Sequence, residues 1–139
     1  MTPPEDLADW LRLMQTPGVG ALTARQLLSA FGPPSLIFQT SHAALTRVVS
    51  AAVASALLAD PDRETQDLIA RTLQWAAQPG QSCITLDDPA YPQSLLDITD
   101  PPPLLYALGN AALLGAPRRL AMVGARTPTA QGERDAKAF

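Results

Sequence analysis

Apolar and polar positions alternate with a helical period over the first 80 residues. In LADWLRLM, Leu7, Trp10, Leu11 and Met14 fall on one face, at the spacing of successive helical turns. Proline and glycine interrupt the pattern at TPGVG (16–20), at 32–34, at 60–61 and at 79–80. The pattern therefore predicts a compact bundle of five or six short helices over residues 1–80.

Several further segments of this half are predicted helices. They are ALTARQLLSAF, SLIFQ, SHAALTRVV, SAAVASALLA and DRETQDLIARTLQWAAQ, the last ended by Gly80. Ser41 and Ser50 stand where N-caps are expected. In the second helix, the apolar pattern continues with Leu22, Leu27, Leu28 and Phe31. Trp75, on an apolar helical face, is expected in the core rather than as a stacking platform for bases.

After Gly80 the chain changes to short apolar runs bounded by Pro, Asp and Gly. SCITL and LLYALG are predicted strands, with Cys83 a small buried residue. LAMVG (120–124) is a continuous apolar run, as expected of a parallel strand covered on both faces. A polar loop and a helix from about Ala130 follow it. This order predicts the first unit of a Rossmann-like parallel α/β domain over residues 81–139. Because a parallel sheet needs more strands, we expect this domain to be incomplete.

The fold class expected is thus a composite, α+β and α/β: a small all-α bundle of helix-hairpin-helix type, then the start of a Rossmann-like domain. With 139 residues, 47% hydrophobic and 17% charged, the chain can bury a core. Its net charge of −3 lacks the overall signature of a nucleic-acid binder. The charge is uneven, however: residues 101–139 carry five bases against two acids, and residues 81–100 carry four acids and no base.

Other compositional features narrow the possible chemistry. A single cysteine excludes an internal disulfide, and one histidine with one cysteine cannot form a typical zinc site. The N-terminus lacks the pattern of a signal peptide, and no apolar run reaches the length of a membrane helix. We expect a cytoplasmic protein with no membrane contact, no metal and no cofactor.

The loop after LAMVG carries the strongest candidate site. Gly124 closes the expected strand, Ala125 is small enough for close approach, and Arg126 offers a forked cation. Thr127 and Thr129 offer hydroxyls, Thr129 also as a helix cap. Gly132, in the first helical turn, would let another segment come near. Backbone amides, the helix dipole and Arg126 would converge on an anion, which predicts a phosphate site; the alternative is an ordinary strand-to-helix turn.

A second glycine loop lies at TPGVG. Gly18 and Gly20 permit positive φ and close backbone approach, and Val19 can fix the turn to the core. This is the hairpin of a helix-hairpin-helix module, which holds DNA phosphates through backbone amides. No Lys or Arg stands beside it, Arg25 being the nearest base, so a plain tight turn is the favoured interpretation.

In this order, the PGVG hairpin, YPQSLLDITDPPPLLYALGN and LAMVGARTPTAQG resemble the DNA-processing protein A family (DprA, also called Smf). The resemblance is most specific from Tyr91 to Gly132. It implies a SAM-like helical domain followed by a larger Rossmann-like domain, with Arg126 holding the DNA backbone and Gly124 and Ala125 shaping its pocket. The family often has serine or threonine at the position of Ala125, and an aromatic residue at that of Gln131.

The resemblance implies single-stranded DNA binding and RecA loading during DNA uptake, without catalysis. It implies a homodimer for the full-length protein, and it places the second glycine-rich loop and the RecA surface beyond Phe139. We therefore expect an N-terminal fragment. Two alternatives stay open: a Rossmann-like enzyme acting on nucleoside monophosphates, with Glu133 as the candidate carboxylate, and a helix-hairpin-helix module that binds duplex DNA or protein through residues 1–80.

Overall fold

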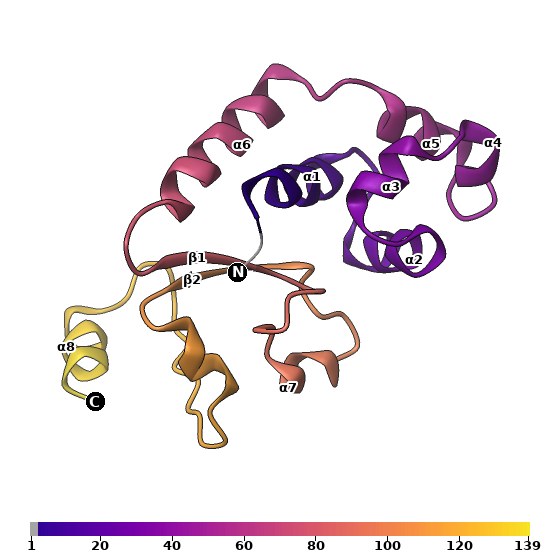
Figure 1. Ribbon diagram of the computed structural model, residues 1–139. Helices are drawn as coiled ribbons and strands as arrows, with labels where there is room; N and C mark the ends of the chain where they lie inside the picture. Colours follow the sequence, from indigo (N-terminus) through magenta and orange to yellow (C-terminus); the bar gives the residue numbers. More distant parts are fainter. Residues whose placement is uncertain (1–2) are drawn as a thin grey trace.

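The computed structural model describes residues 3–139, which form mostly helices and one two-stranded sheet. Figure 1 shows α1 to α6 on one side of this sheet, with α7 and α8 on the other. The elements are α1 (Pro4–Gln15), α2 (Ala21–Phe31), α3 (Pro34–Gln39), α4 (His42–Leu45), α5 (Ala51–Leu58), α6 (Arg63–Ala76), β1 (Gln81–Thr85), α7 (Gln93–Leu96), β2 (Leu104–Leu108), the 3₁₀ helix η1 (Ala111–Gly115) and α8 (Ala130–Ala138).

Local sequence explains where the helices begin. Pro4 occupies the first turn of α1, where its missing N–H has no helical partner to lose. The hydroxyls of Ser41 and Ser50 accept from the amides of Ala44 and Val53, which confirms both predicted caps. The carboxylate of Asp62 caps α6 through the amide of Thr65, and this hydrogen bond lowers the pKa of Asp62.

Two apolar clusters hold these elements together. The first lies among the helices α1 to α5 and the hairpin that joins α1 to α2. Its buried members are Leu13, Val19, Ala24, Leu27, Ile37, Leu45, Ala54 and Leu57. The prediction that Leu22 packs inward is wrong, because its side chain is 63% exposed on the opposite face of α2.

The second cluster joins the helices to the sheet. Leu7 and Leu11 of α1 pack with Cys83 of β1, and Ile69, Leu73 and Leu104 surround them. Cys83 is 2% exposed, as predicted, and burial raises the pKa of its thiol. Because this cluster crosses residue 80, the proposed boundary between residues 1–80 and 81–139 runs through a packed surface; it remains a prediction.

The sheet differs from the expected one. β1 and β2 are strands, as SCITL and LLYALG predicted, but they pair antiparallel, Cys83 opposite Tyr106. The prediction of a buried strand at 120–124 is wrong: Leu120, Met122 and Val123 are 72%, 53% and 93% exposed, and the segment has no strand pairing. Among residues 3–139, only β1 and β2 form a sheet, so the apolar run has no neighbouring strand to receive its backbone hydrogen bonds.

The helix ends were predicted less accurately than the helices themselves. α6 ends at Ala76 rather than at Gly80. Gly80 instead turns the chain into β1 with φ +74°, a conformation that glycine adopts without strain.

Candidate nucleic-acid interface

The loop before α8 is an exposed segment that ends in a capped helix. Thr129 Oγ1 accepts from the amide of Gly132 at 3.1 Å, which confirms Thr129 as the N-cap of a helix that begins at Ala130. A Cβ on Gly132 would lie 3.3 Å from this hydroxyl, so the group that comes near Gly132 is the cap itself. The positive end of the α8 dipole therefore opens on the loop.

A hollow of about 770 Å³ lies between the extended run and α8. Five of the six predicted site residues line it: Gly124, Ala125, Thr127, Thr129 and Gly132. Apolar walls come from Met122, Val123 and Phe139. Arg126 does not line the hollow. The structure thus brings most of the predicted loop residues around one space and leaves the predicted cation outside it.

The charged side chains of α8 largely neutralise one another. Lys137 pairs with Glu133 at 2.7 Å, and Gln131 donates to Asp135 while accepting from Arg134. Arg126 makes no hydrogen bond or ion pair with any residue in 3–139, and it is exposed. Its guanidinium is therefore available to an external anion.

The TPGVG hairpin is a packed turn. Gly18 has φ +83°, and a Cβ there would lie 2.7 Å from Val53 Cγ2 of α5. Val19 is 7% exposed within the first cluster, as predicted. Gly20 is the residue before α2 and has φ −93°, so of the two glycines only Gly18 uses the left-handed region. Packing thus explains why Gly18 is a glycine.

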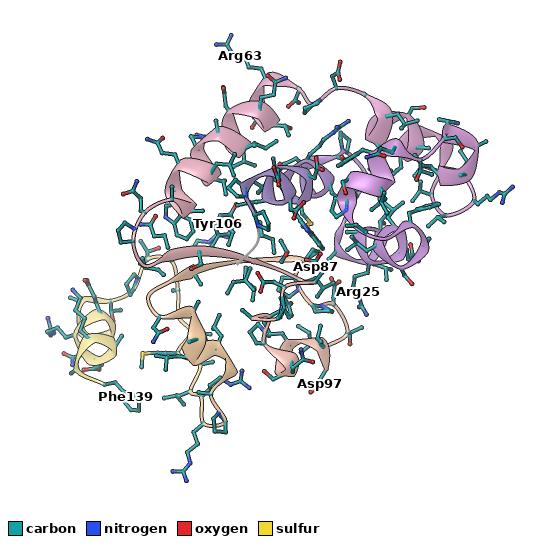
Figure 2. All side chains as sticks on the ribbon, in the orientation of Figure 1. Arg25, Arg63, Asp87, Asp97, Tyr106 and Phe139 are labelled. Atoms are coloured by element: carbon teal, nitrogen blue, oxygen red, sulfur yellow. The ribbon has the colours of Figure 1, made fainter. Side chains whose placement is uncertain are left out.

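The base nearest this hairpin is engaged elsewhere. Arg25 Nη1 donates to the carbonyl of Thr99 at 3.0 Å, in the loop that follows α7. Figure 2 shows Arg25 on the side of α2 that faces this loop. The hairpin and the α8 loop lie at opposite sides of the molecule in Figure 1, so the structure does not bring the two predicted phosphate loops together.

The sequence analysis missed the role of Tyr91. Its side chain is 2% exposed, and its hydroxyl donates to the carbonyl of Pro102 at 2.8 Å. Pro101 and Pro103 are also buried, and Leu86 N donates to Pro103 O beyond the end of the ladder. Burial raises the pKa of Tyr91, and the charge of Arg25 partly offsets this. The Tyr-Pro and triple-proline motifs therefore fasten the loops at one end of the sheet.

Asp87 and Asp88 lie in the segment that follows β1, where a turn joins it to the Tyr91 loop. The turn is present: Asp88 accepts from the amide of Ala90 at 2.8 Å, and Asp87 accepts from Thr85 Oγ1 at 2.6 Å. Asp88 is only 8% exposed, however, because the loop folds back toward Tyr91. Its side chain stabilises the turn rather than facing water.

The described residues also restrict other kinds of site. Residues 3–139 contain no group of three His, Cys, Asp or Glu side chains that could hold a metal ion. Within the same residues, every helix is too short or too polar to span a bilayer.

Comparison with known proteins separates the chain into a matched and an unmatched part. Residues 82–139 match the family described as DNA recombination-mediator protein A. The chain is also 38% identical over 63 residues to the DNA processing protein DprA of Bacillus subtilis (strain 168), an alignment that covers 45% of this chain and 21% of that relative. No solved structure matches significantly. The matched part contains both the Tyr91 motif and the α8 loop, and it is through residues 82–139 that this chain is similar to the DNA recombination-mediator protein A family.

Proposed function

We propose that this chain supplies a phosphate-holding loop to a cytoplasmic protein that binds single-stranded DNA and delivers it to RecA during DNA uptake, without catalysis. One observation carries the proposal: Arg126 is exposed and unpaired among residues 3–139, beside the capped start of α8, within the family-matched segment. Because the chain aligns with about a fifth of its relative, the activity of the whole protein is part of the proposal.

The chemistry of the loop favours phosphate over a base edge. Gly124 and Ala125 leave the backbone accessible, the dipole of α8 attracts an anion, and Arg126 offers two parallel donors. Backbone amides and a helix dipole do not distinguish one base from another, and a guanidinium bound to phosphate does not either. Binding through this loop is therefore expected to be independent of sequence and sensitive to salt.

The two alternatives receive less support. An enzyme acting on nucleoside monophosphates would need a carboxylate near the phosphate, and Glu133 is engaged by Lys137 at 2.7 Å. A phosphate-binding hairpin at 18–20 would need a cation, and Arg25 donates to Thr99 instead. The packing of Gly18 against Val53 gives that hairpin a structural role.

The test is an NMR titration of the 139-residue chain with short oligo-dT at low salt. We expect weak binding, with the amide shifts of residues 124–132 changing and reverting when salt is added. Arg126→Ala should weaken binding by about 1.5–3 kcal/mol, about ten- to a hundredfold. Arg63→Ala, an exposed arginine of α6 far from the loop in Figure 2, is the matched control and should have little effect. Shifts confined to residues 18–21, or binding indifferent to Arg126, would contradict the proposal.

Delivery to RecA needs a second experiment. Residues 82–139 would replace the matching segment of the Bacillus subtilis relative, and the lag before the DNA-dependent ATPase activity of RecA would be measured. We expect this chimera to shorten the lag and its Arg126→Ala variant to do so less. Sedimentation of the chimera tests the homodimer implied by the family resemblance.

A further inference from the structure

Tyr106 is an exposed aromatic side chain on the sheet. It lies in β2 opposite Cys83, on the face that the helices cover, yet it is 54% exposed. Figure 2 shows Tyr106 above the sheet on the side of α6. Single exposed hydrophobic side chains are common on protein surfaces, and Tyr106 is distinguished by how its ring is held.

The ring of Tyr106 is held in one orientation. Trp75 of α6 meets it edge to face, with the ring centroids 5.5 Å apart and the planes at 67°. The hydroxyl of Tyr106 lies 3.4 Å from Thr72 Oγ1, one turn earlier in α6. Trp75 is itself half-buried and packs on the second cluster. A ring fixed in this way loses little conformational entropy when a planar ligand stacks on it.

The charge around Tyr106 favours an anionic ligand. Residues 68–86 contain no acid and one base, Arg71, and residues 104–117 contain no charged residue. Arg71 lies one helical turn before Trp75 in α6 and is exposed. Its Nε donates to the carbonyl of Asp67, and it forms no ion pair with any residue described in the structure. The ring of Tyr106 therefore packs on Trp75, and the cation of Arg71 lies one turn earlier in the same helix.

We propose that Tyr106, supported by Trp75, is a stacking platform for an unpaired nucleobase, with Arg71 binding a phosphate of the same strand. A single strand presents flat π faces and regularly spaced anions, which are the two groups that this surface can accept. A neutral peptide would use the ring and leave Arg71 without a partner. That the strand is DNA rests on the proposed function; the platform itself is a separate contact from the α8 loop.

Photo-cross-linking locates the contact. The 139-residue chain would be irradiated with oligonucleotides that carry 5-iodouracil, a base analogue that reacts with stacked aromatic rings, and the adduct mapped by mass spectrometry. We expect the adduct at Tyr106. Phe139 is 85% exposed and lines the hollow beside α8, so an adduct there reports contact with the α8 loop rather than with the platform. An adduct at Phe139 and none at Tyr106 would overturn the inference.

Variants measure the contribution of each group. Tyr106→Leu should weaken binding at least about fivefold, and up to about 150-fold, whereas Tyr106→Phe keeps the ring and should bind nearly as the parent does. Leu36→Ala, at an exposed apolar side chain of α3, should leave binding unchanged. Arg71→Ala should weaken binding and lower the salt dependence by about 0.7 per lost contact, while Arg63→Ala, eight residues earlier in the same helix, should not. Equal losses for Tyr106→Leu and Tyr106→Phe, or for Arg71→Ala and Arg63→Ala, would overturn the proposed platform.

The two sites can be told apart in one NMR titration. The amides of residues 105–107 report on the platform, and those of residues 124–132 report on the α8 loop. Shifts at the loop without shifts at the platform would overturn this inference and leave the proposed function intact. Shifts at the platform alone would support the inference and count against the loop.

Discussion

Residues 3–116 and residues 117–139 differ in how far their side chains are buried. The first part buries two apolar clusters, and the second has no buried residue. The family match nevertheless runs through both, from residue 82 to residue 139. The matched segment therefore contains two kinds of residue: those that pack, such as Tyr91 and Pro103, and exposed ones, such as Arg126.

The largest test of this comparison is truncation. Cutting the chain after Ala116 removes only exposed residues, so the free energy of unfolding should stay within about 0.5 kcal/mol of the parent. Cutting after Gly80 uncovers Leu7 and Leu11 by removing Cys83 and Leu104. It should cost several kcal/mol, at about 1.5–3 kcal/mol for each side chain exposed.

Urea denaturation followed by circular dichroism measures both truncations. Because the first cluster lies within α1 to α5, residues 1–80 should still show a helical spectrum without denaturant. A coil spectrum for residues 1–80 would contradict an independent helical domain. A large loss on cutting at Ala116 would show that residues 117–139 contribute to packing.

Single substitutions can compare one buried residue of the first part with one exposed residue of the second. Leu27 is fully buried in the first cluster, so Leu27→Ala should cost about 2–5 kcal/mol. Val123 is 93% exposed, and Val123→Ala should change stability by no more than about 0.5 kcal/mol. The urea midpoints of the two variants measure these changes in stability. Similar losses of stability would mean that the extended run at 120–124 is packed in solution.

The two glycines of the hairpin test whether it belongs to the packed part. Gly18→Ala meets both a left-handed φ and Val53, and should cost about 2–4 kcal/mol. Gly20→Ala has an ordinary φ and open space around its Cβ, so it should cost less than about 1 kcal/mol, as at an N-cap. Thermal unfolding measures both. If both variants are neutral, the hairpin is a surface loop, and its glycines need another explanation.

Tyr91 and Tyr106 compare a buried tyrosine with an exposed one. Tyr91→Phe leaves the carbonyl of Pro102 without its donor and should cost about 1–2 kcal/mol. Tyr106→Phe loses only a 3.4 Å contact with Thr72 and should cost less than about 0.5 kcal/mol. Equal costs, measured by urea denaturation, would contradict the assignment of Tyr91 as the structural member of the family motif.

The smallest expected effect is a dependence on alkaline pH. The pKa of Tyr91 is raised in the folded protein, so the folded state keeps a proton that the unfolded chain releases from about pH 10. Stability should therefore fall as pH rises from about 10 toward the folded-state pKa. Cys83 acts in the same direction from about pH 9, and it is present in every variant. Tyr91→Phe should show a shallower decline than Tyr106→Phe, and equal slopes would contradict the assignment.

Prediction from sequence succeeded where the deciding contacts are local. The helical period, the caps at Ser41, Ser50 and Thr129 and the turn at Gly18 depend on residues a few positions apart. The candidate loop was inferred from the same kind of local pattern, and its role stays a prediction. Burial of a strand depends on distant partners, and there prediction failed, because LAMVG has an apolar composition without neighbouring strands in residues 3–139.

The sequence by itself determined the helices, the two short strands, the capped start of α8 and the similarity of residues 82–139 to a known family, because these depend on residues close together in the chain. Only the tertiary structure decided which cations are free. Arg25 lies beside a candidate hairpin in sequence, but folding turns it to the carbonyl of Thr99, 74 residues away. Tyr106 likewise becomes an exposed, supported ring only when α6 places Trp75 against β2. Such contacts join residues far apart in the chain, and their outcome depends on the packing of the whole molecule.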